Sequence, residues 1–481
     1  MKYALLLMSM MMLMTIERVS SIAIPSVRQQ QFLDWKMTMF VHFSITTFTG
    51  SQNGTQSPSA FAPNPDTLNP RQWCETAKKM GAPVAVLTSK HEAGYIIWQT
   101  NEPIGRNFSI AQSSTVPSRD LVDEFTQACR EVGVLPGLYF TTTDAYQTSL
   151  NNSQDVFRKA QLQQIEELST RYGEISYFWF DHHEVTSSAD LWFDIDNIVR
   201  EKQPGAVILG MDTSQVGAES GFSPYPWYYS CNTVDNTTHG RCKFIFLCLF
   251  LISPSPHLHE NNNINKIGIN RTGIPTGQFF KAAESDCSIF GGCHPWFCCG
   301  TVQTLEQSMA HWEGTVGRGS EFIMNVPPNT SGVVDESLVS SASAFGDEVS
   351  RRYGQYGNNL SEYYGTLVNA RSDFVKIGAK LTIDVTNNTF FDRIWVSEDM
   401  KSNGQRVMKY HFEILSDSWS YWVPLRLNET SGGLTIGNAH IDTPGRHEGV
   451  EKLRFVLDEA IGDQDVPVSI HVAVFATGAD S

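Results

Sequence analysis

The stretch Ile175-Ser-Tyr-Phe-Trp-Phe-Asp181 decides how this chain of 481 residues folds. The uninterrupted apolar run Tyr177–Phe180 is typical of a β-strand that is buried on both faces, and such strands belong to parallel sheets. Asp181 follows that run directly. Because α/β enzymes place their reacting groups at the carboxyl ends of parallel strands, Asp181 is a candidate catalytic carboxylate.

A second carboxylate, Glu219, lies one strand further along the chain in Gly217-Ala-Glu219-Ser-Gly221. Two carboxylates from neighbouring strand ends can face each other across a pocket, and glycoside hydrolysis uses this arrangement. The sequence therefore predicts an enzyme that cleaves sugars.

Strand and helix patterns alternate on both sides of the Asp181 strand. We expect strands at 37–43, 84–88, 135–140, 206–210 and 321–326, and helices at 71–80, 119–133, 155–172, 190–202 and 304–316. An alternation of about 35–45 residues per unit indicates parallel βα units. We therefore expect an α/β fold, a (β/α)8-like barrel over residues 30–340.

The pattern changes from about residue 345. Short alternating segments between turn residues, such as Lys380–Val385, Arg393–Val396 and Val468–Phe475, are typical of a β-sandwich. We expect a C-terminal β-sandwich accessory domain over 345–481. Its boundary with the barrel should lie in the Ser-, Asn- and Gly-rich stretch Gly332–Gly346.

The N-terminus and the glycosylation motifs indicate secretion. Lys2 precedes an apolar stretch, Tyr3–Ile16, and small residues follow, so residues 1–21 are expected to be a signal peptide. The stretch falls short of the roughly 20 residues that a membrane-spanning helix needs, so no membrane anchor is expected, and a retained anchor is the alternative. Asn-X-Ser/Thr motifs begin at Asn53, Asn107, Asn151, Asn236, Asn270, Asn329, Asn359, Asn387 and Asn428. Together they predict a glycoprotein that is extracellular or lysosomal/vacuolar.

Charge and cysteine content limit the partners and the chemistry. A net charge of −16 argues against nucleic acid and anionic membranes, which both require clustered Lys and Arg. Nine cysteines leave one unpaired, and disulfides suit a secreted protein. The spacing of Cys287, Cys293, Cys298 and Cys299 favours a local disulfide over zinc.

Residues 243–270 form an anomalous insertion. A short apolar run, Lys243–Ile252, precedes the Asn-rich tract Glu260–Lys266, and neither resembles the surrounding sequence. We expect either an aberrant insertion or a disordered loop.

A set of short motifs appears in order along the barrel region. They are Met39-Phe-Val-His42-Phe-Ser with Thr47-Phe-Thr-Gly50, Phe61-Ala-Pro-Asn-Pro65 with Gln72-Trp73, Leu87-Thr-Ser-Lys-His91-Glu92-Ala-Gly-Tyr95 with Trp98, Gly137-Leu-Tyr139, Trp179-Phe-Asp181, Gly217-Ala-Glu219-Ser-Gly221, Ala283-Glu-Ser-Asp286, and Val316-Gly-Arg-Gly319 with Asn325-Val-Pro-Pro328. In this set the chain resembles glycoside hydrolase family 29, the α-L-fucosidases, and most of all their α-1,3/4-fucosidase branch.

The resemblance implies a retaining hydrolase that removes terminal α-L-fucose from glycoproteins or oligosaccharides. Asp181 would be the nucleophile that forms a covalent fucosyl-enzyme, and Glu219 the general acid/base, with the two carboxyls about 5–5.5 Å apart. Glu284 and Asp286 match acids near the family's pocket and are alternative candidates for the acid.

The resemblance also implies the substrate-binding residues. His42 and His91 would hydrogen-bond fucose hydroxyls, since a neutral imidazole both donates and accepts. Trp98 and Tyr139 would line the pocket, with Trp227 and Trp296 as further candidates. Glu92 stands where much of the family has a second histidine, and we expect it at the pocket together with Glu284.

Other functions remain open from the sequence. A fucose-binding, lectin-like protein without turnover is the main alternative, and a barrel glycosidase for another sugar is the next. We expect no metal, because Tyr95 stands where His91-Glu92 would need a second histidine, and no cofactor, because no phosphate-binding glycine loop is evident. The linkage preference and the oligomeric state are left open.

Overall fold

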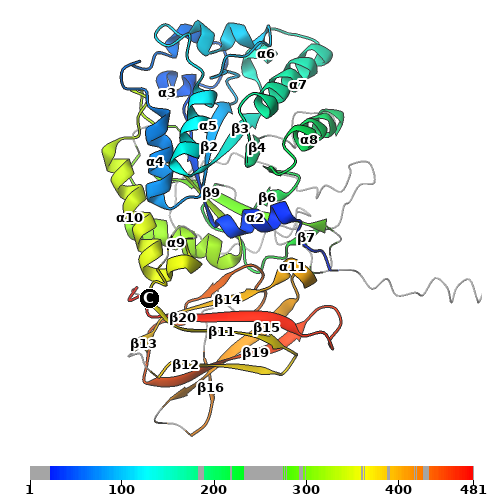
Figure 1. Ribbon diagram of the computed structural model, residues 1–481, viewed down its shortest axis with the longest axis vertical. Coiled ribbons are helices and arrows are strands. Elements are labelled where there is room, and N and C mark those ends of the chain that lie inside the picture. The colour runs from blue at the N-terminus through cyan, green and yellow to red at the C-terminus, as the bar shows by residue number, and fades with distance from the viewer. Residues whose placement is uncertain are drawn as a thin grey trace, which may run out of the picture.

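The computed structural model describes residues 22–479 apart from 182–188, 217–218, 232–272, 274, 276, 278, 292–295, 298–299, 359–360, 362, 387–389, 417, 419 and 426–432. The expected signal peptide, the 243–270 insertion, three of the four clustered cysteines and five of the glycosylation motifs therefore lie outside the described residues. Figure 1 shows two parts, with the helix-covered parallel sheet above a sandwich of antiparallel strands.

The first part is a barrel of eight parallel strands, as the sequence predicts. In spatial order they are β5 (Val207–Ile208), β4 (Tyr177–Asp181), β3 (Leu135–Thr141), β2 (Val84–Lys90), β1 (Met37–Val41), β10 (Glu321–Asn325), β9 (Ala282–Ser288) and β6 (Thr213–Gln215). A single parallel bridge between Leu209 and Thr213 joins the two edges of this sheet. The barrel is therefore nearly closed, and the carboxyl ends of its strands meet at one rim.

Helices cover the outside of the barrel. They are α4 (Pro70–Met80), α5 (Leu121–Val132), α7 (Gln154–Thr170), α8 (Ala189–Lys202), α9 (Leu305–Thr315) and α10 (Glu336–Tyr353). Local capping fixes their ends. Asn69 and Asp120 accept hydrogen bonds from the first turns of α4 and α5, and Gly81 and Gly133 end these helices in the left-handed conformation.

The barrel departs from a regular (β/α)8 pattern after β5. Four residues, 209–212, connect β5 to β6 without a helix. Beyond β6 the chain forms the loop that carries Glu219, and further on β7 (Ser230–Cys231) pairs antiparallel with β8 (Phe279–Phe280). Strand β9 was not expected from the sequence, because its mixture of small and polar residues lacks an apolar run.

Helix α10 lies where we expected the domain boundary. Leu338, Ala342, Phe345, Val349 and Tyr353 recur at helical spacing and are buried. This stripe packs on α4 and α9. The expected start of the sandwich at residue 345 thus falls inside a barrel helix, and the first sandwich strand begins at Leu367.

The second part is a β-sandwich, as predicted. One sheet has β11 (Leu367–Val375), β20 (Val468–Phe475), β14 (Arg393–Glu398) and β17 (His440–Asp442). The other has β12 (Lys380–Asp384), β19 (Val450–Ala460), β15 (Val407–Ser416) and β16 (Val423–Pro424). Alternate apolar residues of both sheets, such as Leu381, Ile383, Val472 and Val474, fill the space between them.

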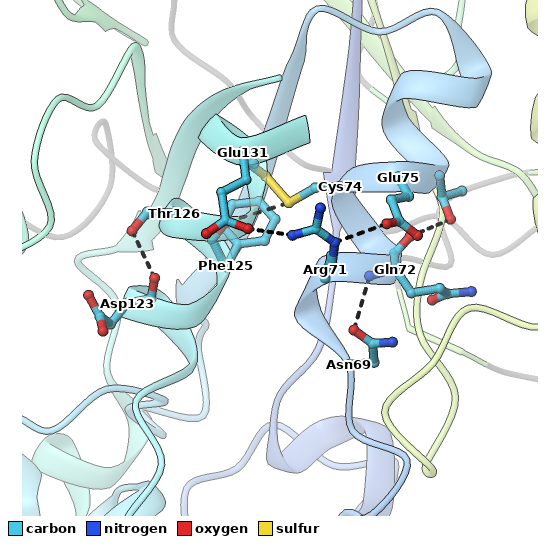
Figure 2. The surroundings of a disulfide bond; sticks show 11 residues. Asn69, Arg71, Gln72, Cys74, Glu75, Asp123, Phe125, Thr126 and Glu131 are labelled. Carbon is cyan, nitrogen blue, oxygen red and sulfur yellow. Dashed lines mark hydrogen bonds and ion pairs between the residues drawn. A yellow bond between two sulfur atoms is a disulfide. The ribbon is translucent and has the colours of Figure 1, made fainter. Parts of the chain in front are cut away.

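A disulfide joins two neighbouring barrel helices. Cys74 of α4 is bonded to Cys129 of α5, and an ion pair between Arg71 and Glu131 lies beside it (Figure 2). Cys287 is buried and free, so the local disulfide expected for its cluster does not include it. No helix in the described part of the chain is long and apolar enough to cross a membrane.

Candidate active site

The rim formed by the strand ends gathers most of the candidate residues. His42 directly follows β1, Lys90 ends β2 just before His91, and Asp181 is the last residue of β4. Tyr139 lies within β3, opposite Trp179 in the parallel register. Residues far apart in sequence therefore meet because parallel strands end at the same edge.

Tyr139 connects Asp181 to the aromatic wall of the site. Its hydroxyl donates a hydrogen bond to Oδ2 of Asp181. Its ring is stacked between His91, 5.1 Å away at 4°, and Trp179, 5.0 Å away at 13°. Burial, followed by the negative charge of Asp181, raises the pKa of Tyr139 well above its ordinary value. Tyr139 therefore stays a hydrogen-bond donor to Asp181 across the working pH range.

His42 is held as a neutral imidazole. Its Nδ1 lies 2.7 Å from Oδ1 of Asn325, the last residue of β10. Burial lowers the pKa of His42 to about 4. Since the amide oxygen only accepts, Nδ1 carries the proton and Nε2 is an acceptor. The ring thus offers an acceptor suited to a sugar hydroxyl.

The ring of Trp296 contacts the rings of both histidines. Its ring lies 5.4 Å from His42 at 90° and 4.9 Å from His91 at 74°. Together with Tyr139 these rings form an aromatic cluster beside Asp181. Such a cluster presents both apolar faces and polar ring edges, as a sugar requires.

Glu284 lies deeper in the barrel, where its carboxylate is fully occupied. It is 1% exposed and accepts hydrogen bonds from Trp179 Nε1 at 2.6 Å, Thr213 Oγ1 at 3.2 Å and the Tyr177 hydroxyl. Burial raises its pKa to about 7, against the opposing effect of these donors. The structure thus places Glu284 behind Trp179, where it orients that ring.

Asp286 interacts electrostatically with the other carboxylates of the site. Gln215 of β6 donates a hydrogen bond to its Oδ1. Burial, followed by the negative charge of Glu219 and then of Glu284 and Asp181, raises the pKa of Asp286 to about 7. Burial and the neighbouring charges therefore favour the protonated form of Asp286.

Glu219 stands on an exposed loop beyond β6. Its φ of 57° is in the left-handed region, which an L-residue with a long side chain rarely adopts. Its charge acts on both Tyr139 and Asp286, so it belongs to the same site. A strained backbone at an exposed acid is typical of functional positions.

The other candidate residues have different surroundings. Glu92 is partly buried, and its charge also acts on Tyr139. Trp98 is fully buried, and its Nε1 donates to Glu167 of α7 at 2.9 Å. Trp227 is 2% exposed and packs its ring on Tyr229. The structure brings neither Trp98 nor Trp227 into the aromatic cluster.

Trp179, Asn325 and Gln215 were not singled out from the sequence as site residues. Trp179 could have been found, because it lies two residues before Asp181 and therefore shares its face of the strand. Asn325 ends β10, next to β1 in the barrel. Gln215 belongs to a three-residue strand that has no clear sequence signal.

This arrangement suits acid–base chemistry on a polar, uncharged ligand. It combines carboxylates, a neutral histidine and aromatic rings. Among the described residues, no group of three or more His, Cys, Asp or Glu side chains could hold a metal ion. The side chains themselves can supply a nucleophile, proton transfer and hydroxyl recognition.

Comparisons with known proteins agree with this chemistry. Residues 59–238 match the family model for α-L-fucosidase. The chain is 26% identical over 477 residues to α-L-fucosidase 1 of Arabidopsis thaliana, an alignment that covers 92% of this chain and 85% of that protein.

Solved structures share the fold. A putative α-L-fucosidase from Bacteroides thetaiotaomicron matches with a TM-score of 0.76 at 22% identity, over 95% of this chain and 98% of that one. A Ruminococcus gnavus GH29 fucosidase in complex with fucose matches with a TM-score of 0.73 at 19% identity, over 94% and 95%. The solved structures show that the fold is shared, and the family model and the curated relative support a place for this chain among the α-L-fucosidases.

Proposed function

We propose that this protein is a retaining α-L-fucosidase that removes terminal fucose from glycoproteins or oligosaccharides. The observation that carries the proposal is the position of Asp181 at the end of β4, with the Tyr139 hydroxyl on its carboxylate. The curated and structural relatives carry fucosidase names, and one solved relative binds fucose. A fucose-binding protein without turnover is not favoured.

In the first step, Asp181 attacks the anomeric carbon of fucose and forms a covalent fucosyl-enzyme. Glu219 gives its proton to the departing glycosidic oxygen in the same step. The hydrogen bond from Tyr139 holds the attacking carboxylate in one orientation. In the second step Glu219 takes a proton from water, which attacks the anomeric carbon, and Asp181 leaves.

The neighbouring rings recognise the sugar. His42 accepts a hydrogen bond from a fucose hydroxyl through Nε2, and His91 supplies a second polar ring edge. Trp296 covers both histidines and offers an apolar surface to the methyl side of fucose. Glu284 acts at a distance, because its carboxylate is occupied by Trp179 and its neighbours.

We further propose an α-1,3/4 linkage preference and an oxidising compartment, either outside the cell or in a lysosome or vacuole. The linkage preference rests on the resemblance of the ordered motifs to that branch of the family, in which Glu219 matches the position of the acid/base. The Cys74–Cys129 disulfide supports the compartment, because reducing cytosol disfavours such bonds.

The test is fucose release by the purified protein from a Lewis-type trisaccharide and from an α-1,2-linked fucoside. Proton NMR of the first product made should show the α-anomer, as retention requires. Asp181→Ala should abolish release from both substrates. Glu219→Ala should abolish release from the trisaccharide, whereas Glu284→Gln and Asp286→Asn should keep part of it.

Three results would contradict the proposal. A β-anomeric first product would exclude retention. Loss of trisaccharide cleavage in Asp286→Asn, with Glu219→Ala still active, would move the acid role to Asp286. Tight fucose binding without release would restore the lectin-like alternative.

A further inference from the structure

The loop that carries Glu219 continues into a segment that the sandwich holds. This segment, Ser223–Tyr229, runs from the rim of the barrel to strand β7. Figure 1 shows β7 and the short helix α11 (Met400–Asn403) near each other at the junction of the two parts. The contacts of this segment show what fixes the loop.

Gln405, between α11 and β15, forms hydrogen bonds with the end of the segment next to β7. Its Nε2 donates to the carbonyl of Trp227 at 2.9 Å, and its Oε1 accepts from the amide of Tyr229 at 3.0 Å. The side chain is 7% exposed. One sandwich side chain therefore satisfies two backbone groups of the segment, as a neighbouring strand would.

Tyr225 forms a second attachment to the sandwich. Its ring stacks on His440 of β17 at 4.6 Å and 29°. Its hydroxyl accepts from the amide of Leu434 at 2.9 Å and donates to the carbonyl of Thr435 at 3.3 Å. His440 is fixed in turn, because its Nε2 lies 3.3 Å from the buried carboxylate of Asp442.

The near end of the loop is attached to the barrel. The amide of Gly221 donates to the carbonyl of Asp286 at 3.0 Å, and Thr315 Oγ1 donates to the carbonyl of Gly221 at 2.7 Å. The amide of Ser223 donates to the carbonyl of Gly314 at 3.1 Å. Glu219 itself is exposed and strained. Its position therefore depends on the attachments of the chain that follows it, first to the barrel and then to the sandwich.

We propose that the sandwich is part of the catalytic machinery, because Gln405 and His440 act as positioning residues for the acid/base Glu219. The inference rests on the proposed fucosidase function. It assigns the C-terminal domain a role in proton transfer, rather than in stability or glycan holding alone. Loosening the far end of the segment should displace the Glu219 carboxylate while leaving Asp181 and the histidines in place.

The experiment uses the dependence of acid catalysis on the leaving group. The alkoxide of a Lewis-type trisaccharide needs a proton in order to depart, whereas the phenolate of chloro-nitrophenyl α-L-fucoside does not. Gln405→Leu should lower kcat/KM about tenfold on the trisaccharide and less than about twofold on the aryl fucoside, a partial loss of the roughly 10²–10⁴-fold that acid catalysis contributes. Azide, which attacks without a base, should raise aryl fucoside turnover in this variant.

Arg406→Leu is the matched control. Arg406 is 3% exposed and adjacent to Gln405, but its side chain donates to sandwich carbonyls, including those of Ile461 and Val466. Within the part of the chain that the structure describes, these side-chain bonds stay inside the sandwich, so the loss of Arg406 should change stability without changing the ratio of the two kcat/KM values. Tyr225→Phe, which keeps the ring and loses both hydroxyl bonds, provides a second variant if Gln405→Leu does not fold.

An equal loss on both substrates, or no loss, in Gln405→Leu or Tyr225→Phe would overturn the inference. So would a change in the ratio for Arg406→Leu of the same size. Failure of the proposed function would be seen in the wild-type protein or in Glu219→Ala, before the Gln405 and Tyr225 variants are compared. Either the wild-type protein would release no fucose from either substrate, or Glu219→Ala would lower both activities equally, and the inference would then be overturned together with its premise.

Discussion

The hydroxyl of Tyr139 donates a hydrogen bond to the carboxylate of Asp181, across the register that pairs β3 with β4. The same ring is stacked between His91 and Trp179. Trp179 is held from behind by Glu284. Glu284, Trp179 and Tyr139 therefore form a row of contacting side chains that orients the carboxylate of Asp181. Each of these side chains can be tested by a conservative substitution.

Tyr139→Phe should lower kcat about tenfold and leave KM nearly unchanged. The substitution keeps the stacked ring but removes one hydrogen bond to a charged group, which is worth about 1.5–3 kcal/mol. Steady-state kinetics on the trisaccharide measure the effect, with fucose inhibition as the check that the pocket is intact. An unchanged kcat would show that the hydrogen bond does not orient Asp181 in the reaction.

Glu219→Gly and Glu219→Ala should both lose trisaccharide activity but differ in stability. Both remove the carboxyl, while only glycine adopts a φ of 57° without strain. The glycine variant should therefore be more stable than the alanine variant by about 1 kcal/mol. Urea unfolding of the two inactive proteins measures this difference directly. Equal stabilities would mean that the loop relaxes in the variants.

Much of the fold follows from sequence periodicity. Strands β1–β4 and β10, and helices α4, α5, α7, α8 and α9, lie within a few residues of their predicted positions. Their apolar residues follow the spacing that burial of one or both faces requires. Strand β9 lacks such a pattern because it carries Glu284 and Asp286, whose carboxyl groups accept hydrogen bonds from side chains of other strands.

The sequence predicts site residues where a polar side chain lies at or next to the end of a strand, as for Asp181, His42 and His91. Tryptophans were harder to assign, since the same ring suits a core and a sugar pocket. Trp98 donates to Glu167 in the core, whereas Trp296 contacts both histidines. The roles of Gln405 and Tyr225 depend on contacts between distant segments, so no local pattern in the sequence could indicate them.

The Cys74–Cys129 disulfide should contribute about 4 kcal/mol to the free energy of unfolding. It closes a loop across a sequence separation of 55 residues, and the gain comes mainly from restricting the unfolded chain. The double variant Cys74→Ala/Cys129→Ala should therefore unfold at a lower urea concentration. Activity at 25 °C should persist, because the bond joins α4 and α5 on the outside of the barrel (Figure 2).

A reducing agent separates the disulfide from the packing of the two side chains. Dithiothreitol should destabilise the wild-type protein and leave the double variant unchanged. If the wild-type protein is equally stable with and without dithiothreitol, the two sulfurs are not bonded in the mature protein. The disulfide would then give no support to an oxidising compartment.

The protein should be more stable at mildly acidic pH than at neutral pH. The pKa of Glu284 is raised from its ordinary value of 4.5 to about 7, and that of Asp286 from 3.8 to about 7. Between about pH 4 and pH 7 the folded state therefore holds protons that the unfolded chain has released. The free energy of unfolding then falls as pH rises through this window, by up to about 1.4 kcal/mol per pH unit for each group.

Asp286→Asn should reduce that slope, because the amide keeps the acceptor for Gln215 and cannot ionise. Urea unfolding at several pH values between 4.5 and 7.5 measures the slope. Asp384→Asn is the control, since the ordinary pKa of Asp384, 3.8, lies below this window and a hydrogen bond from Thr386 lowers it further. If Asp286→Asn and the wild-type protein lose stability equally from pH 5 to pH 7, Asp286 is already ionised at pH 5. Burial and the neighbouring carboxylates would then not keep Asp286 protonated at acidic pH.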